Sequence, residues 1–139
     1  MTGAFGAFTY NLNVVQFSPE EATRVAQERN LWLATVRPNG RPHLVPIWYV
    51  EVDGAWYLCT ESKSVKARNL QAEPRCSWSL ENGDSPLVIE GRARSVAPSQ
   101  AVIAAFRAKF DWDIENDPDN DLVFELSPIR KVMGKAIVD

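Results

Sequence analysis

Short runs of apolar and β-branched residues, separated by polar turns, make up most of the chain and predict strands joined by hairpins. Two turns are clear, Pro38-Asn39-Gly40 and Asp53-Gly54, because glycine adopts the positive φ that a tight reversal needs. Pro46 removes one N–H donor from the second run, so that run should lie at an edge, a bulge or an opening of the sheet. The predicted strands cover residues 31–36, 43–52, 55–60, 76–81, 87–96, 122–126 and 131–138.

Helices are predicted before, between and after these strands. Ser18-Pro19-Glu20-Glu21 starts the first, which should run to about residue 29, because serine can cap a helix and glutamate three residues later can complete a capping box. The second covers 65–72 and is stopped by Glu73-Pro74. A third opens at 97–99. Apolar residues recur in it at helical spacing, namely Val102, Ile103, Phe106 and Phe110.

This order of elements predicts a mainly β fold with helices, in which an antiparallel sheet closes into a barrel and the helices cover its openings. A parallel fold is disfavoured because strands are not regularly followed by crossover helices. No repeat or linker is visible. We therefore expect one domain over residues 1–139, with an N-terminal arm at 1–17.

Composition narrows the function classes. The 139 residues are 45% hydrophobic and 24% charged, with a net charge of −3, which argues against nucleic acid and anionic membranes as partners. No apolar run is long enough to cross a membrane, and the first 17 residues lack the Lys or Arg of a secretory signal. We expect a cytoplasmic protein in which Cys59 and Cys76 are reduced and buried; a disulfide or a catalytic thiol is the alternative.

The segment 60–70 carries the most suggestive chemistry. It places hydroxyl groups at a strand end, then the start of a helix, then several basic side chains. Free N–H groups at a helix N-terminus suit a phosphate, and Lys and Arg neutralise its charge. The alternative is a solvated basic face with an ordinary serine cap, and both glycines of a P-loop are missing. The residues concerned are Thr60, Ser62, Lys63, Ser64, Lys66 and Arg68.

Other candidate groups have plainer interpretations. His43 is the only histidine, and no nearby carboxylate or serine completes a hydrolytic triad, so it reads as a surface or packing residue. The acidic stretch 111–121 alternates like a calcium loop but lacks its glycine and final glutamate, so we predict no metal site. The tryptophans could line a ring-shaped ligand or belong to the core or an interface. They are Trp32, Trp48, Trp56, Trp78 and Trp112.

Several short motifs occur together in a specific order. In that order and spacing the sequence resembles the pyridoxamine-phosphate-oxidase-like split β-barrel proteins that bind flavins, in particular the small branch with deazaflavin (F420) reductases. The resemblance covers about residues 18–139. The motifs are Leu33-Ala34-Thr35, Gly40-Arg41-Pro42-His43-Leu44-Val45-Pro46-Ile47-Trp48, Trp56-Tyr57-Leu58, Thr60, Lys66-Ala67-Arg68-Asn69-Leu70, Glu73-Pro74 and Glu90-Gly91-Arg92-Ala93.

The resemblance implies a six-stranded antiparallel split β-barrel with flanking helices, forming a homodimer with two cofactor sites built from both chains. The family's phosphate-binding positions fall on Thr60, Lys66 and Arg68, with Ser62, Lys63 and Asn69 as further candidates. The cofactor ring would lie along the second strand, where backbone groups would hydrogen-bond its polar edge. The strand residues concerned are Val45, Pro46, Ile47 and Trp48.

The chain departs from true pyridoxamine phosphate oxidases, which carry an arginine and a lysine where Val45 and Val50 stand here, and it lacks their C-terminal extension. We therefore expect an F420- or FMN-dependent oxidoreductase, with F420 preferred, that transfers hydride to a small substrate. The cofactor supplies the reactivity, so no acid–base pair is needed; His43 and Tyr49 are conceivable proton donors, but no catalytic residue is assigned. Two alternatives remain, a non-catalytic protein that stores or senses a flavin, haem or biliverdin, and a purely structural interaction protein.

Overall fold

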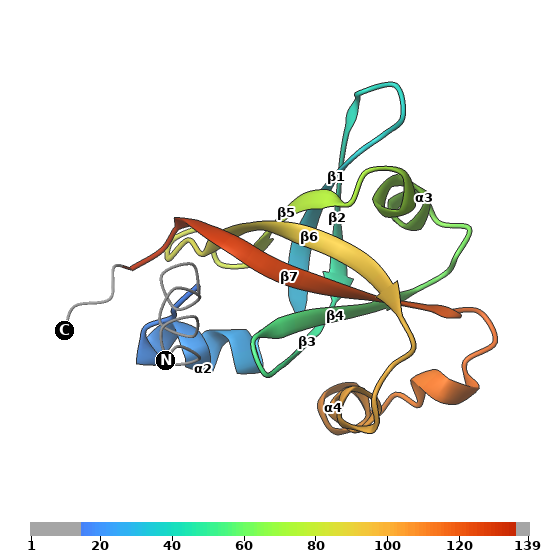
Figure 1. The fold of residues 1–139 in the computed structure, drawn as a ribbon. Coiled ribbons are helices and arrows are strands. Elements are labelled where there is room, and N and C mark those ends of the chain that lie inside the picture. Colours follow the sequence, from blue (N-terminus) through green and yellow to red (C-terminus); the bar gives the residue numbers. More distant parts are fainter. Residues whose placement is uncertain (1–14, 136–139) are drawn as a thin grey trace, which may run out of the picture.

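The computed structural model describes residues 15–135, so the expected arm at 1–17 lies outside it except for the last three residues. One antiparallel sheet of seven strands, in the order β2-β1-β5-β6-β7-β4-β3, forms the body of the molecule (Figure 1). Strands β2 and β3 stand at the two ends of this order, so the sheet is open between them. The strands are β1 (Asn30–Val36), β2 (Pro42–Trp48), β3 (Val50–Val52), β4 (Ala55–Thr60), β5 (Arg75–Leu80), β6 (Val88–Val96) and β7 (Leu122–Met133).

The mainly β, antiparallel prediction is confirmed, but the sheet has seven strands and is not a closed barrel of six. The expected strand 43–52 is divided at Tyr49, whose side chain is fully buried and whose hydroxyl donates to the Val25 carbonyl at 2.6 Å. The chain turns inward there, and β3 pairs with β4 at the far end of the sheet.

The two strands expected at 122–126 and 131–138 are one continuous strand, β7, and residues 136–138 lie outside the described range. Pro128 does not interrupt it because β4 pairs with β7 only as far as Leu126. Beyond that point one side of β7 is a free edge, where a missing N–H costs no ladder bond. Pro128 faces Gly91 beside a register shift, and a Cβ on Gly91 would lie 2.3 Å from the Ser127 carbonyl oxygen.

Helices cover the openings of the curved sheet (Figure 1). Helix α2 (Pro19–Gln27) has the predicted capping box, in which Ser18 N–H donates to Glu21 and Glu21 N–H donates to the Ser18 hydroxyl. Helix α3 (Val65–Ala72) has the predicted bounds, and α4 (Gln100–Phe110) is capped by Ser99. A short 3-10 helix, η1 (Ile114–Asn116), lies within the predicted acidic loop.

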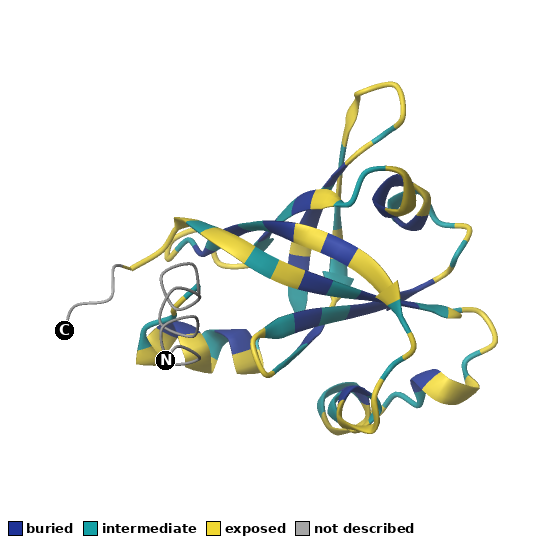
Figure 2. Cartoon of the chain, in the orientation of Figure 1, coloured by how far each residue is buried: buried dark blue, intermediate teal, exposed yellow. Residues whose placement is uncertain are grey.

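Buried and exposed residues alternate along β6 and β7, as expected for strands with one face on a core (Figure 2). The main core contains Trp56 and Trp78, and a second cluster under α4 includes Phe106. Cys59 and Cys76 are buried free thiols as predicted, and burial raises the pKa of both to about 12. Within residues 15–135, no helix is both long and apolar enough to cross a bilayer.

Candidate functional site

The start of α3 is a rigid, hydroxyl-rich turn at the end of β4. The Ser64 hydroxyl caps the helix by accepting from Ala67 N–H at 3.2 Å. The hydroxyl of Thr60, a residue only 4% exposed, lies 3.4 Å from the Ser64 oxygen. Ser64 N–H donates to the Glu61 carbonyl at 3.1 Å, which closes the turn. Two predicted features, the cap and a strand-end hydroxyl, are therefore adjacent at a helix N-terminus.

A buried polar contact fastens α3 to the sheet. The Asn69 side-chain amide donates to the Thr35 hydroxyl on β1 at 3.0 Å, and both residues are at most 3% exposed. Thr35 in turn stands opposite His43 on β2. Asn69, a predicted binding residue, therefore projects from α3 toward the β1–β2 hairpin. Its Nδ2 is already hydrogen-bonded to Thr35.

Basic side chains from two distant segments meet beside this contact. Arg37 from the β1–β2 hairpin and Arg68 from α3 line the same hollow, of about 360 Å³, together with Asn69. Lys66 is half-buried one turn before Asn69, and burial lowers its pKa while Glu61 acts in the opposite direction. Among the ion pairs of residues 15–135, none involves Arg37, Lys66 or Arg68. In a chain of net charge −3, this is a local excess of positive charge.

His43 belongs to this basic group, although its sequence context did not indicate it. The side chain is partly buried, and Nδ1 is buried without a hydrogen-bond partner. Burial lowers the pKa of His43, and the positive charges of Arg37 and Lys66 lower it further. Burial and these two cations therefore favour the neutral form of the imidazole.

Two other predicted phosphate-binding residues lie elsewhere. Both the backbone N–H and the hydroxyl of Ser62 donate to the Asp121 carboxylate, at 2.9 and 3.0 Å. Lys63 borders a separate hollow whose other walls include Asp119 and Asp121. Of the six predicted positions, Thr60 lies beside the cap of α3, Lys66 lies in its first turn, and Arg68 and Asn69 line the hollow with Arg37, whereas Ser62 and Lys63 face the acidic loop.

The register of β2 decides which of its backbone groups are free. Arg37 N–H donates to the Arg41 carbonyl, and Tyr49 N–H donates to the Arg29 carbonyl, so hydrogen bonds close both ends of the β1–β2 ladder. Hydrogen-bonded pairs alternate in an antiparallel ladder. Counting from either end, the backbone groups of Val45 and Ile47 point toward β1, whereas those of Pro46 and Trp48 point to the open edge. The missing donor of Pro46 therefore breaks no bond within the sheet.

The side chains of β2 also follow the predicted alternation. Pro46 and Trp48 share the exposed face, and Val45 and Ile47 turn inward. Trp48 is 39% exposed, and its indole stacks on Phe110 of α4 with centroids 4.4 Å apart. At the open edge of β2, the backbone N–H of Trp48 is therefore a free donor next to the stacked rings of Trp48 and Phe110.

The chain matches the family model described as Pyridoxamine 5'-phosphate oxidase over residues 17–130. It belongs to the pyridoxamine 5'-phosphate oxidase family. The resemblance drawn from the sequence motifs is therefore confirmed. Among curated proteins, no sequence matches the chain.

Solved structures share this fold. A conserved hypothetical protein from Mycobacterium tuberculosis is 32% identical, with a TM-score of 0.65, and the match covers 85% of this chain and 83% of that one. The heme storage protein HutZ from Vibrio cholerae is 24% identical (TM-score 0.71, 86% and 98% covered). A structure described as an F420 reductase is 21% identical (TM-score 0.59, 78% and 93% covered). The last two likenesses concern the fold alone.

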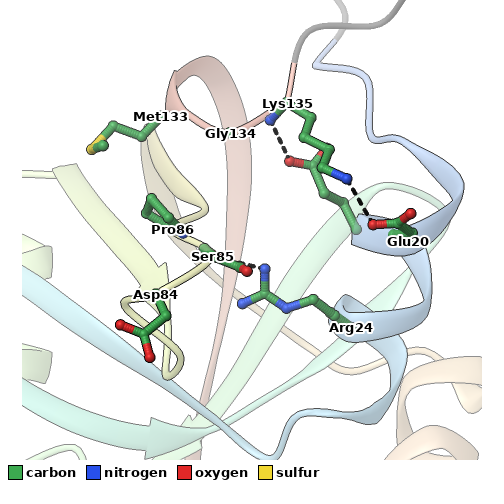
Figure 3. A pocket seen from close by; sticks show the side chains of 9 residues that line it. Glu20, Arg24, Asp84, Ser85, Pro86, Met133, Gly134 and Lys135 are labelled. Atoms are coloured by element: carbon green, nitrogen blue, oxygen red, sulfur yellow. Dashed lines mark hydrogen bonds and ion pairs between the residues drawn. The ribbon is translucent and has the colours of Figure 1, made fainter.

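A second hollow, of about 450 Å³, lies between α2, the β5–β6 connection and the end of β7 (Figure 3). Its basic side chains are already paired, Lys135 with Glu20 at 2.8 Å and Arg24 with Glu28 at 2.8 Å, while Asp84 has no ion pair among residues 15–135. Arg24 also donates to the Ser85 carbonyl. These contacts join α2 to the β5–β6 connection and to the end of β7. The cations beside α3, in contrast, have no ion pairs among residues 15–135.

The acidic stretch after α4 is occupied by protein donors. Asp117 accepts from Trp112 Nε1 and from the backbone N–H groups of Asp119 and Asn120, each at 2.8–2.9 Å. Asp113 accepts from Glu115 N–H at the start of η1. Within residues 15–135, no three metal-ligating side chains converge.

Sequence reasoning assigned no binding role to Thr35 or Arg37 and considered His43 only as a conceivable proton donor. All three lie on the first hairpin, between 22 and 30 residues before the start of α3 at Val65. Only the packing of α3 against β1 brings them together. The one available hint was the pair of arginines, Arg37 and Arg41, that flanks the Pro38-Asn39-Gly40 turn.

Proposed function

We propose that this chain binds a flavin-type cofactor, F420 or FMN, and transfers hydride between it and a small substrate. The observation that carries the proposal is a set of cations without ion pairs among residues 15–135 at α3: Arg37 and Arg68 line one hollow, and Lys66 lies in the first turn of the same helix. Both cofactors carry phosphate, and charge-assisted hydrogen bonds from Lys and Arg are the strong contacts that phosphate makes in proteins.

The donor set fits a phosphate group. Lys66 and Arg68 supply charge, and the N-terminus of α3 supplies a partial positive charge and free N–H groups. The Thr60 hydroxyl lies beside that terminus. In this proposal the phosphate lies against the start of α3, and Ser62 and Lys63 contribute little because they face the acidic loop.

The ring of the cofactor would lie along the open edge of β2. The backbone N–H of Trp48 is directed to that edge, and Pro46 has no backbone N–H that would compete with it there. The cofactor supplies the hydride chemistry when bound. The chain's part is to hold the ring, exclude water and orient the substrate. Tyr49 takes no part in proton transfer because it is fully buried and its hydroxyl is bonded to Val25.

A second copy of the chain would complete the site. The outer face of β1 and β2 is apolar: Trp32, Val36 and Leu44 are 40%, 41% and 61% exposed. The register places Trp32 opposite Pro46 and Val36 opposite Pro42, so these side chains form one continuous surface. Contiguous exposed apolar surface of this kind marks an interaction site. A homodimer that covers it would bring a second chain to the edge of β2.

Titration of the purified protein with FMN, with F420 and with hemin tests the proposal. We expect binding of F420 or FMN, with F420 tighter, and quenching of tryptophan emission that is reduced in Trp48→Phe because the ring lies along β2. Binding of neither flavin-type cofactor would contradict the proposal. Binding of hemin alone would favour the non-catalytic alternative, storage or sensing of a planar ligand such as haem or biliverdin, which HutZ, a heme storage protein of the same fold, makes a concrete rival.

A further inference from the structure

His43 is placed to respond to whatever anion occupies the basic site. Its partner across the ladder, Thr35, is hydrogen-bonded to Asn69, and Asn69 lines the hollow that also contains Arg37 and Arg68. Residues facing each other in a hydrogen-bonded antiparallel pair have Cα atoms about 5.5 Å apart. His43 is therefore the neighbour of the Thr35–Asn69 contact at the border of the hollow in which the anion is proposed.

No protein group fixes the charge of this imidazole. Among residues 15–135 the His43 side chain makes no hydrogen bond, and Nδ1 is buried. The charges that act on it are both positive, Arg37 from the hairpin and Lys66 from α3. Glu61 acts on Lys66. The state of His43 is thus set by burial and by two cations, and a bound anion would reverse the balance of charge around it.

We propose that His43 takes up a proton from solvent when an oxyanion binds beside Lys66, so that the anion and the proton bind together. The inference rests on the proposed phosphate site. Without the anion, a third positive charge beside Arg37 and Lys66 is unfavourable. With a dianion present, the imidazolium gains an opposite charge at close range. His43 then acts as a binding residue of the site, in its charged form only.

Proton linkage gives the proposal a measurable size. If the pKa of His43 rises by one pH unit on anion binding, the anion binds about tenfold more tightly below both pKa values than above them. The affinity for an anion of constant charge should therefore increase as the pH falls. Phosphate itself gains a proton in this range, so sulfate is the better probe.

The test uses the fact that the chain has one histidine. Its imidazole resonances are followed by NMR between about pH 5.5 and 7.5 with and without sulfate at constant ionic strength. This range stays below the pKa of Lys109, which burial lowers to about 8. We expect sulfate to raise the pKa of His43, and the affinity for sulfate to increase at least several-fold from the upper to the lower pH. In a folded His43→Gln variant this dependence should disappear.

FMN titrations of the same samples separate the possible failures. If FMN binds but sulfate leaves the pKa of His43 unchanged, or if His43→Gln keeps the parent's pH dependence, the inference is wrong and the proposed function stands. If neither FMN, F420 nor sulfate binds, the proposed function fails and the inference falls with it. A Lys66→Gln variant should weaken sulfate binding at every pH, so that more sulfate is needed for the same rise in the pKa of His43; a His43 response to sulfate that is unchanged in this variant would place the anion away from Lys66.

Discussion

At the scale of single residues, two lysines on either side of the start of α3 have different surroundings. Lys63 precedes α3 and borders a hollow with Asp119 and Asp121, whereas Lys66, in its first turn, is half-buried and acts on His43. Sequence spacing placed both in one phosphate-binding group. The distinction depends on the acidic loop, which is some fifty residues away in the chain and holds Ser62 through Asp121.

Substitution of these basic residues should show which of them contribute to cofactor binding. Lys66→Gln and Arg68→Gln should each weaken binding of FMN or F420 by about 1–3 kcal/mol, because each removes a charge-assisted contact to phosphate. Lys63→Gln is the matched control and should bind like the parent. Fluorescence titration measures all three. Equal losses for Lys63→Gln and Lys66→Gln would place the phosphate at the acidic side of the loop instead.

At the scale of elements, the β1–β2 ladder explains why a proline is tolerated within a strand. The sequence left three places open for Pro46: an edge, a bulge or an opening. The structure selects an edge, since β2 is the first strand of the sheet and the nitrogen of Pro46 points away from β1. Register is a long-range property, so the proline alone could not have shown which neighbouring N–H groups are free.

Two substitutions on β2 test this register. Pro46→Ala should lower the free energy of unfolding by no more than about 1 kcal/mol, the effect of a more flexible unfolded chain. Val45→Pro should lower it by about 1–3 kcal/mol more than Pro46→Ala does, because the Val45 N–H points toward β1 and its ladder partner loses a hydrogen bond. Urea unfolding of both variants measures the difference. Similar values for the two would show that the alternation along β2 is opposite to that described.

A buried carboxylate connects α2 to the end of β7 and the residues that follow it. The Glu21 carboxylate, 5% exposed, accepts from Lys131 Nζ at 2.7 Å and from Lys135 N–H at 2.8 Å. Burial by itself would raise the pKa of Glu21, but the hydrogen bonds from Lys131, Ser18 and Lys135 together outweigh it and lower the pKa. A carboxylate with a lowered pKa stabilises the fold above its unfolded pKa, and this stabilisation is lost as the pH falls through the folded value.

Glu21→Gln should therefore reduce stability in a pH-dependent way. At neutral pH we expect a loss of about 2 kcal/mol, the scale of a hydrogen bond to a charged group. The difference between parent and variant should shrink as the pH falls below the ordinary glutamate pKa of about 4.3 and through the lowered pKa of Glu21 in the folded chain. Glu20→Gln, which removes an exposed ion pair with Lys135, is the control and should have little effect. A pH-independent loss in Glu21→Gln would contradict the charge-based account.

At the scale of the whole molecule, local signals predicted the elements and failed at points decided by tertiary contacts. Ser18 and Ser64 cap their helices as predicted, and the Asp53-Gly54 turn has the positive φ values, 53° and 88°, of a tight hairpin. The break at Tyr49 and the continuity through Pro128 were missed. The first depends on a hydrogen bond to α2, and the second on where β4 stops pairing with β7.

The apolar outer face of β1 and β2 leads to the last prediction, which concerns assembly. Leu44, 61% exposed, lies at the centre of the surface that the proposed homodimer covers, and it stands opposite Ala34 in the ladder. Leu44→Glu places an unpaired charge in that interface, so the variant should sediment as a monomer at micromolar concentrations. The change is on the solvent side of β2, and the free energy of unfolding of the chain itself should change little.

Loss of the dimer should also weaken cofactor binding in Leu44→Glu, although Lys66 and Arg68 are untouched, because the second chain completes the site at the open edge of β2. Ala104→Glu, at an exposed position of α4, adds the same charge outside the apolar face of β1 and β2 and should remain dimeric with the parent's affinity. If Leu44→Glu is monomeric and binds FMN or F420 like the parent, one chain suffices for the site. If the parent itself sediments as a folded monomer that binds cofactor, the apolar face serves another purpose, and the start of α3 with the edge of β2 would have to hold the cofactor alone.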